Sequence, residues 1–179
     1  SVKPYQPEGL WSELSFASKS RTTDFYVQDT GDSLYRRSLY TFWKRSVPPP
    51  TMATFDAPSR EMCVLSRPKT NTPLQALALM NDPTFVEAAR VLAENLMSES
   101  NDSETQLKTA FQTILSRLPS AFELQTLHRG FEKRLAYFKD EAHHAQSLID
   151  VGSTEPRATL DASYLAALST SMMNLLNLD

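Results

Sequence analysis

Residues 35–83 read YRRSLYTFWKRSVPPPTMATFDAPSREMCVLSRPKTNTPLQALALMNDP. The stretch combines aromatic and basic side chains with a triple proline and two proline-led helix starts. Thr72-Pro73-Leu74-Gln75 is a capping box with proline at the first helical position, and Asp82-Pro83 is a second N-cap followed by proline. An irregular segment with so many large and charged side chains fixes either a specific surface or a specific polar core. We expect it to determine what the chain does.

The residues before the first capping box predict three segments. Residues 1–31 are interrupted by Pro4, Pro7, Gly9 and Gly31 and predict an extended arm. Residues 32–47 predict a basic-aromatic helix, in which apolar side chains recur at helical spacing. Pro48-Pro49-Pro50 would end this helix, because proline lacks the N–H group that the helix needs. Residues 48–70 then predict a long proline-rich loop packed over the bundle, of the kind that is functional or well packed in compact domains.

The remainder of the chain, residues 71–179, predicts a helical bundle. Ser103 with Gln106 and Ser120 with Glu123 predict two further helix caps, and Pro156 is expected in the first turn of the last helix. Each predicted helix carries one apolar stripe, so the helices must pack on each other. Four glycines are too few for the tight turns of a sandwich or barrel. The sequence therefore predicts an all-α fold, a single-domain helical bundle of five to six helices over 1–179.

Composition argues against several classes of protein. The net charge of −3 disfavours a nucleic-acid binder, and no apolar run approaches 18 residues, so membrane insertion is not expected. The single cysteine, Cys63, permits no intrachain disulfide and reads as a packed apolar side chain. His143 and His144 are adjacent on a predicted helix and should diverge, which makes them a poor metal pair. We expect no catalytic residue, metal site or cofactor. We also expect a non-enzyme rather than an enzyme.

Charge is concentrated in the segment 36–69, which holds seven basic side chains opposed only by Asp56 and Glu61. The candidate binding residues are Arg36, Arg37, Lys44, Arg45, Arg60, Tyr40 and Asn71. Guanidinium groups bind sulfate and carboxylate bidentately, and neighbouring aromatic rings stack on sugars. Three interpretations stay open: internal ion pairs that hold the loop, an anion-binding face, and a docking face for an acidic protein.

Several motifs in one order resemble a known family. They are RRSLYTFWKR, VPPP, FDAPSRE-x-C, TNTPLQAL and LMNDPTFVEAAR, with VKPYQPEGLW near the start and LLNLD at the end. The chain resembles the planctomycete PSD domain, the domain-of-unknown-function family numbered fifteen fifty-three. The resemblance implies a C-terminal part of a large exported protein of the periplasm or cell envelope, in a family that often carries a cytochrome-c-like module. The chain has no Cys-x-x-Cys-His, so a haem would lie outside it.

The resemblance brings no established reaction with it. The expected function is a non-catalytic structural and interaction domain, whose partners are other domains of the same parent protein. One alternative is a binding module for anionic, sulfated or carboxylated polysaccharide. The other is part of an active site completed by an upstream domain, with Asp56, Arg60 or Asn71 lining a pocket.

Overall fold

The computed structural model describes residues 1–6, 9, 11, 26–44 and 47–178. The all-α prediction is confirmed: these residues form helices and two isolated β-bridges, with no strand among them. The helices are α1 (Pro50–Thr54), α2 (Pro73–Asn81), α3 (Pro83–Glu99), α4 (Ser103–Leu115), α5 (Ala121–Asp140), α6 (Ala142–Ile149) and α7 (Ala162–Leu176). These seven exceed the five to six expected. The extra elements are the short α1, inside the predicted loop, and the break between α5 and α6.

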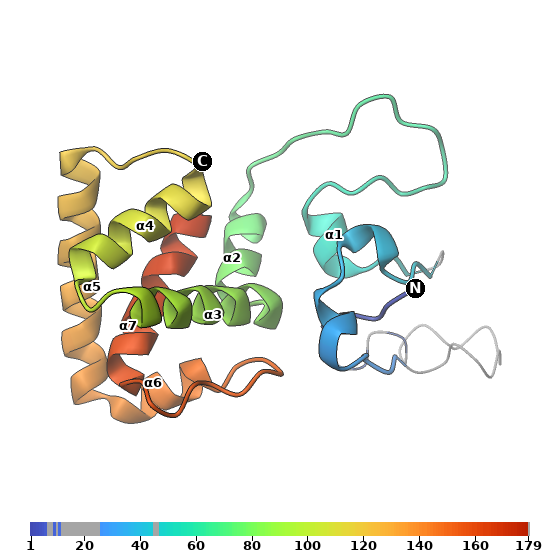
Figure 1. The fold of residues 1–179 in the computed structure, drawn as a ribbon. Coiled ribbons are helices and arrows are strands. Elements are labelled where there is room, and N and C mark those ends of the chain that lie inside the picture. The colour runs from blue at the N-terminus through green and yellow to red at the C-terminus, as the bar shows by residue number, and fades with distance from the viewer. Residues whose placement is uncertain (7–8, 10, 12–25, 45–46, 179) are drawn as a thin grey trace. The chain divides into compact units, whose positions relative to one another are not determined.

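The chain divides into two compact units, Ser1–Ala78 and Leu79–Asp179. The second unit is built around α7, which packs against α3, α5 and α6 (Figure 1). Its residues from Leu165 to Ser169 and from Ser171 to Met173 are buried, so α7 is enclosed on all sides rather than amphipathic. The two serines donate hydrogen bonds to carbonyls one turn earlier, Ser169 to Leu165 and Ser171 to Ala167, which lets hydroxyls sit in an apolar core.

That the whole chain behaves as a single domain stays a prediction.

The helices around α7 each contribute one apolar face. Their buried side chains are Val86, Ala89, Ala93 and Leu96 of α3, Leu107, Ala110 and Phe111 of α4, Phe131 and Phe138 of α5, and Ala145 and Ile149 of α6. Phe131 also meets the Tyr164 ring edge-on, with centroids 5.1 Å apart. The burial of these faces supplies the main stabilisation of the unit.

A buried charged network ties the segment before α7 to α3. Glu87, Arg90 and Glu94 lie on one side of α3, each with less than 5 % of its surface exposed. The Glu87 carboxylate accepts hydrogen bonds from the backbone N–H groups of Ser153 and Thr154, at 3.1 and 2.7 Å, and from the Thr154 hydroxyl. Arg90 donates to the Thr154 carbonyl and hydroxyl, both at 2.7 Å, and forms a salt bridge with Glu94. Each buried charge therefore has an opposite charge or a hydrogen-bond partner.

Helix caps agree with the sequence in part. Asp82 caps α3 by accepting from Thr84 N–H at 2.9 Å, and Ser120 with Glu123 forms the expected capping box of α5. Two expected starts are wrong. Asp102, rather than Ser103, caps α4. The last helix begins after Asp161 rather than near Pro156, because the Glu87–Arg90 network holds the preceding segment in a non-helical path.

In the first unit the predicted helix over 32–47 is wrong. The structure has two short 3-10 helices, η2 (Gly31–Tyr35) and η3 (Ser38–Tyr40), separated by extended residues. The backbone of Val2 pairs with this segment: Val2 N–H donates to Tyr40, and Phe42 N–H donates to Val2. An extended backbone at Thr41–Phe42 is needed for this pairing, and tertiary contacts outweigh a weak helical preference.

The N-terminal arm is tied to the same segment through Trp11. Trp11 is 3 % exposed and contacts the rings of Tyr26 and Phe42, at centroid distances of 5.1 and 5.6 Å. Residues 12–25, the middle of the predicted arm, lie outside the described residues.

Candidate functional site

The loop between α1 and α2 is closed at its base by a hydrogen-bonded clasp, which we define as Asp56, Thr70 and Gln75. The Asp56 carboxylate accepts from the Thr70 N–H and hydroxyl, at 2.8 and 2.7 Å. Gln75 Nε2 donates to the Thr70 hydroxyl and to the Thr54 carbonyl, both at 3.0 Å. Gln75 is 8 % exposed and also completes the capping box of α2 with Thr72. The predicted box is therefore confirmed, and the same glutamine closes the loop.

The chemistry of the clasp is reflected in its carboxylate. The hydrogen bonds from Thr70 lower the pKa of Asp56 below its usual value, with smaller contributions from Gln75 and the positive charge of Arg67. Asp56 also adopts a left-handed backbone conformation, with φ of 58°, at the point where the loop leaves α1. Non-glycine residues rarely take this conformation, and aspartate is among those that tolerate it.

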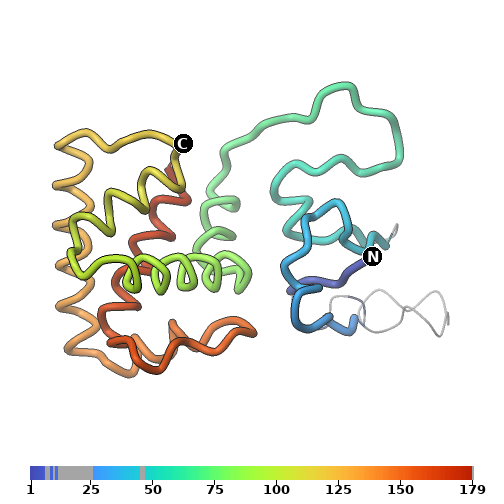
Figure 2. The backbone as a smooth tube through the Cα atoms, viewed as in Figure 1, coloured from blue at the N-terminus to red at the C-terminus, as the bar shows by residue number. Residues whose placement is uncertain are grey.

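Residues 57–69, which we call the clasped loop, leave α1 and return to α2 as a long excursion of the backbone (Figure 2). From Pro58 to Thr70 every residue is exposed. The apolar side chains among them are also exposed: Met62 at 74 %, Val64 at 46 % and Leu65 at 108 %. Cys63 is a free, exposed thiol beside them, so the expectation of a packed cysteine is wrong. The loop is held at its base and exposed at its tip, and its packing over the bundle stays a prediction.

Helix α2, which follows the clasp, also exposes apolar side chains. Leu74, Leu77 and Met80 have exposed fractions of 60, 57 and 42 % and share one face of the helix at a spacing of three residues. Its polar Gln75 is the buried residue instead. This is an inversion of the usual pattern, in which the apolar side chains of a helix are the buried ones.

The predicted binding residues are only partly brought together. Arg36, Arg37 and Tyr40 are exposed around η2 and η3. The Arg36 guanidinium lies over the Tyr40 ring, 4.8 Å from its centroid, a cation–π contact at the surface. Tyr35 is exposed to 49 % beside them. These four residues form a basic-aromatic patch of the first unit.

The other predicted residues are used elsewhere. Lys44 Nζ lies 4.7 Å from the ring of buried Trp11, and Arg60 stacks over Trp43 at 4.6 Å. Arg60 has φ of 63°, so this stacking occurs at a second left-handed position. Asn71 is exposed beside the clasp. Arg45 lies outside the described residues.

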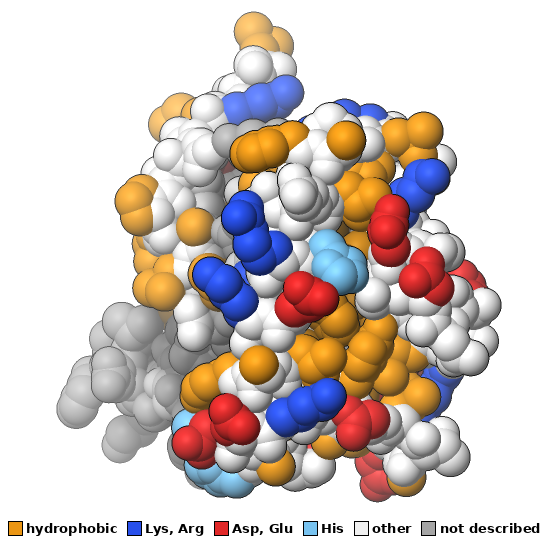
Figure 3. Space-filling view, turned by 90° about the vertical axis from the view of Figure 1, so that its left-hand side faces the viewer, with side chains coloured by type: hydrophobic (Ala, Val, Ile, Leu, Met, Phe, Trp, Pro, Cys, Tyr) orange, Lys and Arg blue, Asp and Glu red, His pale blue; other side chains and the backbone are white. Residues whose placement is uncertain are grey.

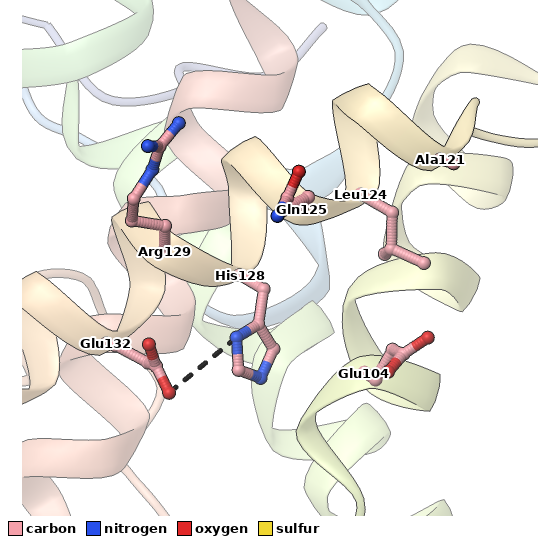
Figure 4. A pocket seen from close by; sticks show the side chains of 7 residues that line it. All are labelled: Glu104, Ala121, Leu124, Gln125, His128, Arg129 and Glu132. Atoms are coloured by element: carbon pink, nitrogen blue, oxygen red, sulfur yellow. Dashed lines mark ion pairs between the residues drawn. The ribbon is translucent and has the colours of Figure 1, made fainter.

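A hollow of about 500 Å³ lies between α4 and α5 in the second unit. Its lining residues are Glu104, Ala121, Leu124, Gln125, His128, Arg129 and Glu132. Figure 4 shows His128 and Glu132 on α5 with Glu104 on α4. The face drawn in Figure 3 carries histidine side chains at its surface, among charged and apolar ones. No sequence pattern marks these residues as a site.

His128 in this hollow stands between a hydroxyl and a carboxylate. Ser103 Oγ lies 3.2 Å from His128 Nε2, and Glu132 Oε1 lies 3.7 Å from Nδ1. This is the order of groups in a serine hydrolase, but 3.7 Å is too long for the hydrogen bond that orients a catalytic histidine. The Glu132 side chain is 63 % exposed, so solvent screens its charge. The arrangement is that of a surface hydrogen bond beside a weak i,i+4 ion pair.

The clasp could have been anticipated only in part. The capping box marked Gln75 and Thr72, but the loop length between Asp56 and Thr70 hides their contact. An irregular segment has no helical or strand periodicity, so the sequence does not show which of its apolar side chains are exposed.

Comparison with known proteins identifies one family. A family model described as PSD1, Protein of unknown function (DUF1553), matches residues 1–131. No curated protein and no solved structure matches the chain. No helix among the described residues is long and apolar enough to cross a membrane. The matched residues include the clasp, the clasped loop and the whole of α3 and α4, and the chain belongs to the PSD1 (DUF1553) family of proteins of unknown function.

Proposed function

We propose that this chain is a non-catalytic interaction domain of a larger exported bacterial protein, and that the clasped loop docks onto another domain of the same polypeptide. The proposal rests on one contrast within the loop. Hydrogen bonds close its base, whereas the apolar side chains at its tip are exposed. Export and the larger parent protein rest on the family resemblance alone.

The energetics favour a covered loop. Full burial of a side chain such as Leu65 or Met62 is worth about 1.5–3 kcal/mol each relative to exposure. Contiguous exposed apolar surface on a soluble protein typically marks an interaction site. The clasp fixes the loop ends before binding, which reduces the conformational entropy lost when a partner orders the tip.

Cys63 provides a direct test, because it is the only cysteine of the chain and is exposed in the clasped loop. We would measure its alkylation rate by a maleimide in residues 1–179 alone and, by peptide mapping, in the parent polypeptide. The proposal predicts at least about tenfold slower alkylation in the parent. Equal rates in the two would overturn it.

A variant separates docking from local burial of the thiol. Leu65→Asp places a charge in the proposed interface and should restore rapid alkylation of Cys63 in the parent. Glu61→Gln, a neighbouring exposed position, should leave the protection in place. If protection appears in residues 1–179 alone and rises with protein concentration, the loop binds a second copy of the chain and the proposed partner is wrong.

A second candidate function is the binding of an anionic glycan by the basic-aromatic patch. It is favoured by the exposure of Arg36 and Arg37 beside Tyr35 and Tyr40. Sulfate groups would pair with the guanidinium forks, and sugar rings would stack on tyrosine.

Melting curves with sulfated and carboxylated glycans at low and moderate salt test this candidate. A salt-sensitive rise in Tm that Arg36→Ala and Arg37→Ala both lose, while Arg129→Ala in the second unit retains it, would support the patch. Curves that no glycan shifts would exclude it.

A further inference from the structure

The corner between α5 and α6 gathers three side chains that are suited to a metal ion. Glu141, His143 and His144 each offer a ligand atom, and these atoms lie within 4.8 Å of one another. All three side chains are exposed. We propose that Glu141, His143 and His144 form a binding site for a divalent transition-metal ion of the Zn²⁺ class.

The two histidines converge although they are adjacent in sequence. Their ring centroids are 4.5 Å apart, with planes tilted by 44°. Both lie in the first turn of α6, directly after the corner at Glu141, where the last turn of α5 faces them. The expectation that adjacent histidines diverge does not take this corner into account.

Tyr137 on α5 holds one imidazole in place. Its hydroxyl is 2.7 Å from His144 Nδ1, and the two rings are stacked with centroids 5.8 Å apart. Tyr137 in turn meets buried Phe138 edge-on at 5.3 Å, which connects the site to the core. When His144 Nδ1–H donates to the tyrosine oxygen, the Nε2 lone pair is free for a metal. Such a hydrogen bond to the second ring nitrogen is the usual support of a histidine ligand.

The third ligand is a carboxylate that does not serve as a helix cap. Glu141 is both the C-cap residue of α5 and the N-cap residue of α6, yet its side chain makes no capping hydrogen bond. Its backbone, with φ of −115° and ψ of 62°, turns the chain at this position. The carboxylate can therefore turn toward the two imidazoles without disrupting a helix terminus.

The donor set determines the class of ion. Two imidazole nitrogens and one carboxylate oxygen suit Zn²⁺, Ni²⁺ or Cu²⁺, whereas Ca²⁺ and Mg²⁺ prefer oxygen donors throughout. Bonds of about 2.0–2.1 Å in tetrahedral geometry place donor atoms roughly 3.4 Å apart. Rotation of exposed side chains between rotamers closes the difference from the present spacing. The remaining position stays open to water or to a ligand from a partner.

Isothermal titration of chelator-treated protein with ZnCl₂ tests the site, in a buffer that does not bind metal. We expect one saturable Zn²⁺ site per chain and a rise in Tm with added Zn²⁺, because the ion binds the folded corner. The double variant His143→Ala/His144→Ala and the single variant Glu141→Gln should each weaken binding at least about tenfold. Tyr137→Phe should weaken it by a similar factor through loss of ring orientation.

His128→Ala is the matched control, because His128 also lies beside a glutamate, Glu132, but has no second histidine. It should leave Zn²⁺ affinity unchanged. Circular dichroism of each variant checks that the helices persist. The proposal is overturned if the native chain shows no saturable site, if the double variant binds as tightly as the native chain, or if His128→Ala weakens binding to the same extent.

Discussion

The two tethered segments of this molecule use the same hydrogen-bonding pattern in opposite surroundings. In the first unit Asp56 accepts from the N–H and hydroxyl of Thr70, and in the second Glu87 accepts from the N–H and hydroxyl of Thr154. Glu87 is 1 % exposed and shares its threonine with the buried Arg90, whereas the bonds of Asp56 are exposed. The two carboxylates thus share a hydrogen-bonding pattern and differ in burial and in the presence of a buried cation.

Burial changes what the pattern does. An exposed carboxylate exchanges water for protein donors at small net gain, so the Asp56 clasp shapes a loop. A buried carboxylate has no water to return to, so loss of a partner leaves a charge stranded. The exposed bonds of Asp56 therefore hold a loop that remains accessible to a partner. The buried bonds of Glu87 fix a segment that is part of the fold.

The largest effect should come from Arg90→Met in the buried network. The change removes the buried cation that Glu87 and Glu94 share, and leaves Glu94 only the half-exposed Arg157, 3.6 Å away. We expect a loss of about 3–5 kcal/mol in the free energy of unfolding. Urea unfolding of the chain measures it. Arg117→Met, which breaks the exposed pair with Glu123, is the control and should cost far less, because solvent screens that pair. Equal costs for the two would remove burial as the deciding variable.

Gly152→Ala should follow in size. A Cβ at this position would lie 2.5 Å from Glu87 Cδ, and φ is 111°, a conformation that L side chains rarely adopt. We expect about 2–4 kcal/mol of destabilisation from the combined strain and displacement of the carboxylate.

Gly31→Ala separates these two causes. Gly31 has φ of 60°, and no atom of the described residues lies within 4 Å of the added Cβ, so only the backbone penalty of about 1 kcal/mol is expected. Thermal or urea unfolding of both variants gives the difference. A Gly152 variant no worse than the Gly31 variant would mean that Glu87 moves aside freely.

The sequence predicted the elements whose causes are local. The caps at Asp82 and Ser120 and the capping box at Thr72 depend on residues within one turn, and all three appear in the structure. The apolar stripes of α3, α4 and α5 likewise identify buried faces, because helical periodicity is set by the backbone.

What the sequence missed depends on contacts between distant residues. The extended path at Thr41–Phe42 is fixed by pairing with Val2, and the late start of α7 by the hold of Glu87 and Arg90 on Thr154. Of the candidate site, Arg36 and Tyr40 were named as binding residues with their exposure left open, whereas the clasp and the exposed apolar tip of its loop were not predicted. Asp56 and Thr70 are fourteen residues apart, and a contact over this separation leaves no periodic signal in the sequence.

Asp56→Asn should leave global stability nearly unchanged and loosen the clasped loop. We expect little change in the free energy of urea unfolding, because the bonds are exposed, and faster protease cleavage within residues 57–69. The lowered pKa of Asp56 gives the pH dependence its sign. The carboxylate's contribution is present above its ordinary pKa and is lost as pH falls toward the lowered folded value, so acid should loosen the native loop but not the variant's. Asp32→Asn, an exposed acid outside the clasp, should change neither cleavage nor its pH dependence.

The smallest effect, and the sharpest test of burial as the variable, concerns Glu123. Hydrogen bonds from Arg117, and then from Ser120, lower the pKa of this exposed carboxylate to about 2. Because the folded pKa is depressed, the associated stability is present above the ordinary glutamate pKa and is lost as pH falls toward 2. Side-chain carboxyl NMR should show the Glu123 midpoint near 2, and Arg117→Leu should raise it toward the ordinary value. Unfolding of that variant at neutral pH should differ little from the native chain, because solvent screens the pair. The Arg117 guanidinium also lies 4.7 Å from the centroid of the buried Phe111 ring, a contact that Glu123→Gln leaves in place. A large loss in both variants would show that the number of hydrogen bonds, rather than burial, sets the strength of such carboxylates, and the contrast between Asp56 and Glu87 would then need another cause.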